Sequence, residues 1–197
     1  MLIFTDKSKK QDLMKFYGFL LLASLVVFAS CSKKQNFEAN FDNTNDRVWV
    51  GKDFWSVPLE DWKVENGQLH CIGKVPESRV NLLTHVLSSE LGDFEVSAKI
   101  MLADEGGAPG SAGFFVGIAD DEDPDVRAAC YFGEGVKAGV SLNGYAFLKN
   151  EKVDLPEDFD FSEFIVKVSG NNSKLRLDVM DKDGKVVKEL TSDHEPI

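Results

Sequence analysis

The stretch that decides the fold is LRLDVMDKDGKVVKEL, residues 175–190. In its first half, leucine and valine alternate with the polar side chains of Arg176 and Asp178, which predicts a β-strand with one buried and one solvated face. In its second half, Asp183-Gly184 precedes another run of strand-forming residues. Asp-Gly tolerates the positive φ angles of a type I′ turn, so the stretch predicts a β-hairpin.

Two further hairpin signals extend this assignment along the chain. Asn66-Gly67 lies between WKVE and QLHCI, and Asn143-Gly144 lies between GVSL and YAFL. Residues 93–100 alternate in polarity, whereas FFVGI at 114–118 and FIVKV at 164–168 are almost continuously apolar and are predicted to be central strands. We therefore predict an all-β fold, a two-sheet antiparallel sandwich of about ten strands.

The composition limits the classes of function. The chain has 197 residues, with 22 Lys and Arg against 33 Asp and Glu and a net charge of −11. Nucleic-acid binding needs clustered basic side chains, which this acidic chain lacks, so we expect no nucleic-acid partner. Three Cys and three His are too few for a disulfide-dense scaffold or a four-cysteine zinc site. A hydrophobic fraction of 43% is enough for the core of one domain.

The N-terminus has the pattern of an export signal. Lys15 precedes an apolar run at 16–30, which is shorter than the roughly 20 residues that span a bilayer. The sequence FASC at 28–31 resembles the lipobox of bacterial lipoproteins. The resemblance implies that residues 1–30 are a signal peptide and that Cys31 is acylated. A plain secretory signal with an incidental cysteine is the alternative.

A short polar segment follows the cysteine. Residues 31–40 are expected to form a flexible tether between the lipid and the domain. Ser32, directly after the cysteine, resembles the sorting signal of lipoproteins destined for an outer membrane. The expected location is the bacterial cell envelope, with the membrane as a partner through the lipids on Cys31.

Four segments together resemble concanavalin A-like lectin/glucanase domains. They are DWKVENGQLHC at 61–71, GDFEVSAK at 92–99, GSAGFFVGI at 110–118 and FIVKVSG at 164–170. The resemblance implies a laminin G-like jelly roll over residues 41–197, with a glycan as the ligand class. Residues 191–197 show no strand pattern, so either the sheet closes in an unusual way or the sandwich is incomplete at its C-terminal end, as in a fragment of a longer protein. We favour the second interpretation.

A narrower resemblance is to the sandwich module that precedes the catalytic domain of some secreted PhoD-like phosphatases. It rests on the segments 61–64, 82–85, 110–114 and 127–133. One hypothesis is a non-catalytic module for carbohydrate binding or domain positioning. The other is the N-terminal part of a larger secreted hydrolase, a phosphatase or a glycosidase, with a covalently linked catalytic domain downstream. We expect no catalytic residues in this segment, because no two carboxylates share a strand face with glycosidase spacing.

Aromatic side chains are the candidate sugar-binding residues, because aromatic rings stack on the C–H faces of pyranoses. The candidates are Trp49, Trp55, Tyr131 and Tyr145. Trp49 and Trp55 are predicted to lie in a loop-like stretch. The alternative for every one of them is packing in or at the end of the sandwich, as we expect for Trp62.

The densest acidic cluster is the other candidate site. Asp120, Asp121, Asp123 and Asp125 crowd oxygen ligands of the kind that Ca²⁺ binds. The alternative is an exposed loop without a ligand, since the cluster has no glycine pivot and no fixed ligand spacing. Apart from this possible calcium ion, we expect no cofactor.

The two cysteines of the domain, Cys71 and Cys130, are each predicted to lie on a strand. Export allows them to oxidise to a disulfide, but the sequence does not establish whether their Cα atoms lie within bridging distance. We expect two buried free thiols.

Overall fold

The computed structural model describes residues 36–73, 78–85, 93–102, 110–119, 125–171 and 173–193. The chain divides into two compact units, Met1–Glu38 and Ala39–Ile197, and the fold described below is that of the second. The predicted signal peptide, the acylated Cys31 and the first half of the predicted tether lie outside the described residues. Within the described residues, the helices are too short or too polar to cross a bilayer.

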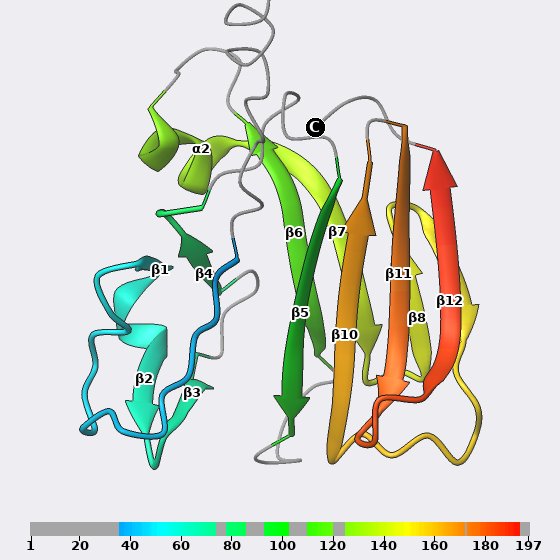
Figure 1. Ribbon diagram of the computed structural model, residues 1–197, viewed down its shortest axis with the longest axis horizontal. Coiled ribbons are helices and arrows are strands. Elements are labelled where there is room, and N and C mark those ends of the chain that lie inside the picture. The colour runs from blue at the N-terminus through cyan, green and yellow to red at the C-terminus, as the bar shows by residue number, and fades with distance from the viewer. Residues whose placement is uncertain are drawn as a thin grey trace, which may run out of the picture. The chain divides into compact units, whose positions relative to one another are not determined.

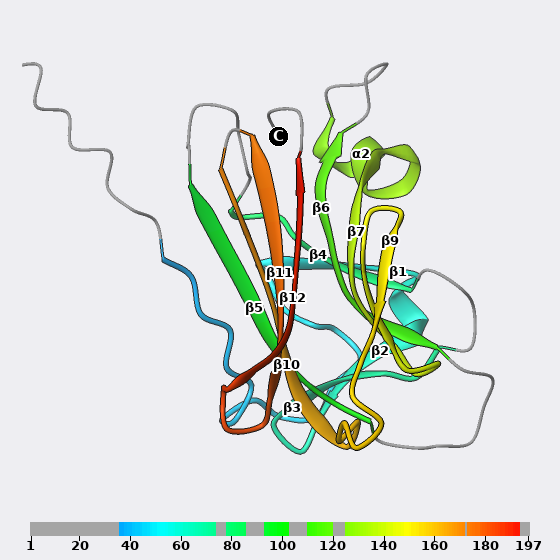
Figure 2. The same cartoon turned by 90° about the vertical axis from the view of Figure 1, so that its right-hand side faces the viewer.

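Two four-stranded antiparallel sheets face each other (Figure 1, Figure 2). The first has the order β12-β11-β10-β5, and the second has the order β6-β7-β8-β9. The strands of the first sheet are β5 (Phe94–Met101), β10 (Glu163–Gly170), β11 (Lys174–Asp181) and β12 (Val186–Asp193). Those of the second are β6 (Ser111–Ala119), β7 (Glu134–Ser141), β8 (Tyr145–Leu148) and β9 (Glu151–Asp154). The predicted antiparallel sandwich is confirmed.

The core lies between the two sheets, where the inward side chains of alternate residues meet. On β10 and β11, Val166, Val168 and Leu177 are completely buried. Ala138 of β7 and Leu148 of β8 are their counterparts on the second sheet. The polar alternation predicted for residues 93–100 appears along β5 as half-buried and exposed positions in strict succession. Removing these apolar side chains from water supplies the main driving force for the two sheets to pack.

The three predicted hairpins are present, and their turns differ in geometry. Asn66 and Gly67, between β2 (Trp62–Glu65) and β3 (Gln68–Cys71), both have positive φ, at 51° and 75°, as a type I′ turn requires. In the turns at Gly144 and Gly184, only the glycine has positive φ, at 89° and 82°. The N–H of Gly184 donates to the carbonyl of Asp181, which is the arrangement of a type I turn followed by a glycine bulge.

Two short antiparallel ribbons precede the sandwich; we call them the N-terminal ribbons. In one, β1 (Phe54–Val57) pairs with β4 (Arg79–Leu82). In the other, β2 (Trp62–Glu65) pairs with β3 (Gln68–Cys71), and the 3₁₀ helix η1 (Leu59–Asp61) lies between β1 and β2. Figure 1 shows the ribbons beside the β5 and β6 edges of the two sheets. The sandwich itself is built from β5 to β12.

The structure corrects two predictions about strand positions. Residues 164–168 lie on the central strand β10, as predicted, but residues 114–118 lie on β6, an edge strand of the second sheet. The reason is a third layer: Phe115 points outward from β6 and meets the Arg79 guanidinium of β4, so both faces of this edge strand are covered. The second correction concerns the end of the chain, where residues 191–193 continue β12 although they show no apolar alternation.

A third correction concerns residues 126–132, which were expected to include a strand and instead form the helix α2 (Val126–Phe132). Asp125 caps the helix, because its carboxylate accepts a hydrogen bond from the Arg127 N–H at 2.9 Å. Gly133 ends it. A helix of two turns is too short to show a 3.6-residue apolar period, so its cap was the only local signal.

Candidate functional site

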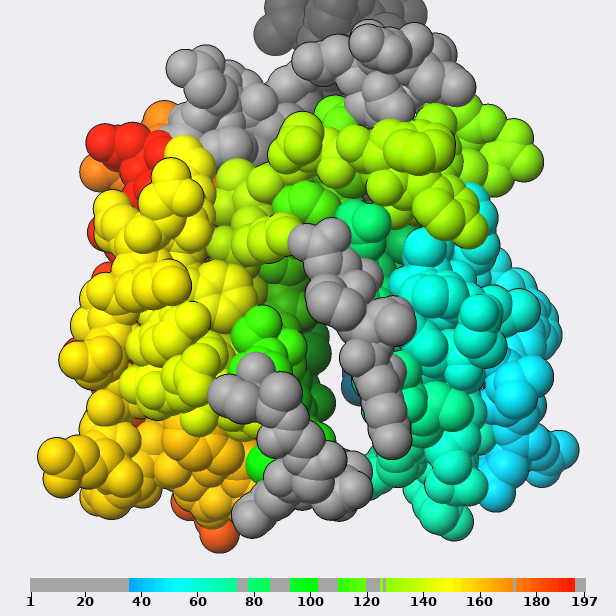
Figure 3. All heavy atoms as spheres, turned by 180° about the vertical axis from the view of Figure 1, so that it is seen from behind, coloured from blue at the N-terminus to red at the C-terminus, as the bar shows by residue number. Residues whose placement is uncertain are grey.

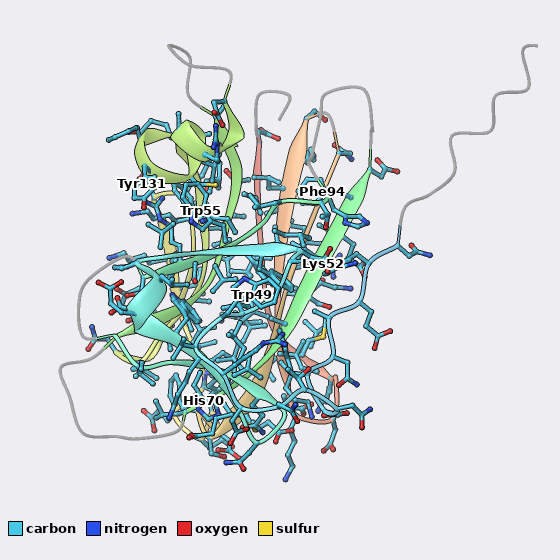
Figure 4. The ribbon with its side chains drawn as sticks, turned by 90° about the vertical axis from the view of Figure 1, so that its left-hand side faces the viewer. Trp49, Lys52, Trp55, His70, Phe94 and Tyr131 are labelled. Carbon is cyan, nitrogen blue, oxygen red and sulfur yellow. The ribbon has the colours of Figure 1, made fainter. Side chains whose placement is uncertain are left out.

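Helix α2 and strand β1 bring three aromatic side chains together at the surface. The Trp55 and Tyr131 ring centroids are 5.2 Å apart in an edge-to-face arrangement, and Phe132 lies 6.0 Å from Tyr131. Tyr131 is 51% exposed and Phe132 is 78% exposed. We call these three residues the aromatic ridge. Figure 4 shows Trp55 and Tyr131 side by side at the end of β1, apart from Trp49 and His70.

The position of the ridge follows from how α2 ends. The N–H of Gly133 closes the helix on the carbonyl of Ala129. A Cβ atom at position 133 would lie 2.5 Å from that carbonyl oxygen and 2.7 Å from the Ala119 carbonyl oxygen of β6. Glycine therefore lets the last turn of α2 lie directly against β6, while Tyr131 and Phe132 stay exposed. Figure 3 shows the yellow-green atoms of this part of the chain at the surface of the molecule.

Strand β4 supplies polar contacts beneath the ridge. The Asn81 amide donates to the Trp55 carbonyl at 3.2 Å and holds β1 in register with β4. The Arg79 Nη2 atom donates weakly to the Tyr131 carbonyl at 3.5 Å, and its Cζ lies 5.6 Å from the Phe115 ring centroid. The Arg79 Nε atom is buried and finds no hydrogen-bond partner among the described residues.

Trp55 and Tyr131 are thus the two sequence-predicted residues that the structure brings together. Trp55 lies on β1 and not in the predicted loop. Phe132 and Arg79 were not predicted. The CYFG sequence would have indicated a paired aromatic surface if the helix had been recognised from its Asp125 cap, whereas no local signal marks Arg79.

The other two predicted aromatic residues lie elsewhere. Trp49 precedes β1 in a loop, as predicted, and is 53% exposed; the Arg47 guanidinium lies 5.2 Å from its ring centroid. Tyr145 lies on β8, where the Lys152 ammonium is 4.7 Å from its ring centroid. Hydrogen bonds with Ser141 and then Lys152 lower the pKa of Tyr145. Each of these rings therefore has a cation as its neighbour, and neither belongs to the ridge.

The predicted calcium site falls mostly outside the described residues. Asp120, Asp121 and Asp123 are among the residues that are not described, while Asp125 is engaged as the cap of α2. Hydrogen bonds from the Arg127 side chain and backbone lower the pKa of Asp125 to about 2. Across the described ranges, no three His, Cys, Asp or Glu side chains are placed to hold a metal ion.

The cysteines and Trp62 complete the predicted set. Both thiols are free, but Cys71 lies exposed on β3, so the expectation of two buried thiols is wrong for it. Cys130 lies buried in α2 and not on a strand, and burial raises the pKa of its thiol although the Arg79 charge opposes this. The Trp62 indole N–H is buried, in keeping with the expected packing role.

Comparisons with known proteins complete the description of the site. No protein-family model matches the chain, and no curated protein or solved structure matches it significantly. The resemblances to concanavalin A-like domains and to PhoD-like phosphatases therefore stay predictions. The function proposed below rests on the residues of this chain.

Proposed function

We propose that this chain is an exported, lipid-anchored and non-catalytic β-sandwich module that binds carbohydrate. The aromatic ridge is its binding surface. The single observation that carries the proposal is that Tyr131, whose ring contacts both Trp55 and Phe132, is 51% exposed and that Phe132 is 78% exposed.

The reason lies in the energetics of exposed rings. A large apolar side chain gains roughly 1.5–3 kcal/mol when it is buried, so two adjacent aromatic residues left in water mark a surface suited to binding. A planar ring can cover one C–H face of a pyranose, and Tyr131 also offers a phenolic hydroxyl as a hydrogen-bonding group. Trp55 supports Tyr131 from the side, which limits the conformational entropy that Tyr131 loses on binding.

The rest of the proposal concerns the fold family and the anchor. Strand β5 pairs with β10, although the four strands of the other sheet lie between them in the chain. This long connection is typical of Greek-key sandwiches and supports a concanavalin A-like jelly roll. The apolar run at 16–30 followed by Cys31 supports acylation. Two or three acyl chains would anchor the module stably.

The test is a glycan array probed with the full chain in mild detergent. For the double variant Tyr131→Ala/Phe132→Ala, we expect the signal of any bound glycan to fall about tenfold or more, which corresponds to about 1.4 kcal/mol of lost stacking. Trp49→Ala is the matched control, since it removes an exposed aromatic side chain outside the ridge.

Two outcomes would contradict the proposal. If no glycan binds the wild-type chain, carbohydrate binding is wrong. If the double variant binds like wild type while Trp49→Ala does not, the binding surface lies at Trp49. Circular dichroism of each variant checks that the sandwich is intact.

A further inference from the structure

Arg79 is the charged group closest to the aromatic ridge for which the structure gives a contact. It belongs to β4, it is half-buried, and its Nη2 atom reaches the carbonyl of Tyr131. The Phe115 ring lies against one side of its guanidinium, and its Nε is buried without a hydrogen-bond partner among the described residues. The guanidinium is therefore partly desolvated and held in place by rings and backbone.

No described carboxylate neutralises this cation. The chain has 33 acidic residues, yet none of the described ones forms an ion pair with Arg79. The carboxylate of Asp125, at the opposite terminus of α2 from Tyr131 and Phe132, is held by Arg127 with contacts of 2.6 to 3.2 Å. The Cys130 thiol, which the Arg79 charge influences, remains protonated at neutral pH because burial raises its pKa.

A second cation lies near the first. The Lys137 Nζ atom of β7 is 5.5 Å from the Phe115 ring centroid, and the Arg79 Cζ is 5.6 Å from the same centroid. The Arg79 guanidinium, beside a surface of exposed aromatic residues, places a positive charge there on an acidic protein. An anionic ligand at this place would gain a charge-assisted hydrogen bond from a guanidinium that is already partly desolvated.

We infer that the glycan bound at the aromatic ridge is acidic, and that Arg79 binds its carboxylate or sulfate group. This inference rests on the proposed function and names its ligand class. The ridge stacks on a sugar ring while the planar guanidinium pairs with the oxyanion of the same or the next residue of the glycan. Specificity against neutral sugars then comes from the Arg79 charge, which no carboxylate of the described residues neutralises and which a neutral ligand does not pair.

The experiment is isothermal titration calorimetry of the full chain with four probes. They are trigalacturonate, its fully methyl-esterified form, a sulfated trisaccharide and a neutral trisaccharide. We expect the carboxylate or the sulfate probe to bind about tenfold more tightly than the uncharged probes, with an advantage that shrinks as salt is raised. Whichever anionic probe binds identifies the oxyanion.

Variants of Arg79 test its part directly. Arg79→Met keeps an apolar stem against Phe115 and removes the charge, so we expect it to abolish the advantage of the anionic probe and to leave binding of the neutral probes unchanged. Arg79→Lys should keep part of that advantage. Arg47→Met is the matched control, because Arg47 also lies over an aromatic ring, that of Trp49.

The outcomes separate this inference from the proposed function. If neutral and anionic probes bind wild type equally, or if Arg79→Met weakens neither, the inference is wrong while carbohydrate binding stands. If no sugar of either kind binds, and the array is also blank, the proposed function itself fails. Even if Arg79→Met does not fold, the affinities of the wild-type chain for trigalacturonate and for its methyl-esterified form show whether the bound glycan is acidic.

Discussion

The outer faces of the two sheets differ in the groups that lie next to their cationic side chains. On the first sheet, side chains of opposite sign form a continuous network, with three pairs across strands and one along β11. The pairs are Glu95 with Lys167 at 3.5 Å, Lys167 with Asp178 at 3.6 Å, Asp178 with Arg176 on the same strand at 2.8 Å, and Arg176 with Glu189 at 3.0 Å. On the outer side of the second sheet, cations lie over aromatic rings: Arg79 and Lys137 over Phe115, and Lys152 over Tyr145.

The difference shows which face is suited to binding. A cation paired with a carboxylate has little charge left to offer a ligand, whereas a cation over an aromatic ring keeps most of its charge. The first face is a stabilising surface that satisfies its own charges. The second face, together with α2 and the N-terminal ribbons, presents aromatic rings and two cations, Arg79 and Lys152, that have no carboxylate partner among the described residues.

The largest expected effect comes from breaking the second sheet at Gly139. Its Cβ would lie 2.3 Å from the Ala112 carbonyl oxygen and 2.9 Å from the Gly113 Cα, so Gly139→Ala forces β6 and β7 apart. We expect a loss of about 3 kcal/mol in the free energy of unfolding, at the upper end of typical overpacking costs. Denaturant titration measures it.

Gly110→Ala is the control for this variant, since a Cβ there meets nothing within 4 Å. It should change the free energy of unfolding by no more than about 0.5 kcal/mol. Equal stability of the two variants would mean that β6 and β7 do not approach as closely as described.

A smaller effect is expected from breaking the charge network of the first sheet at Asp178. Only 3% of its side chain is exposed, and it bridges Lys167 and Arg176. Asp178→Ala should cost about 2 kcal/mol, because both cations lose their buried partner but can rehydrate at the surface. Chemical denaturation at neutral pH measures the loss, and ridge binding should be unaffected.

Glu189→Ala is the companion variant at the exposed end of the same network. The Glu189 side chain is 47% exposed, so its removal should cost no more than about 1 kcal/mol. A cost equal to that of Asp178→Ala would show that burial does not set the strength of the network.

The smallest effect concerns the cap of α2 and is read by pH. Arg127 holds the pKa of Asp125 at about 2, below the ordinary 3.8, so the carboxylate stabilises the folded state above about pH 4 and this contribution is lost as the pH falls towards 2. An NMR titration of the carboxyl group measures the pKa, and Arg127→Ala should raise it. A value near 3.8 in the wild-type chain would mean that Arg127 does not pair with the Asp125 carboxylate in solution.

Much of the sandwich could be predicted because its signals are local. Alternation along residues 93–100 and 175–179 set the faces of β5 and β11, and glycine in each hairpin allowed the positive φ of its turn. The edge position of β6 could not be predicted. A continuous apolar run indicates that both faces of a strand are buried, but it does not show whether the strand is central or whether a third layer covers its outer face.

The sequence alone determined the antiparallel sandwich and the aromatic candidates, because side-chain period and turn preference act between near neighbours in the chain. Only the tertiary structure selected Trp55 and Tyr131 from those candidates and added Phe132. It also placed Arg79 beside them, over the Phe115 ring and without an ion pair to any described carboxylate. Contacts between distant segments depend on how whole layers pack, and no local pattern encodes them.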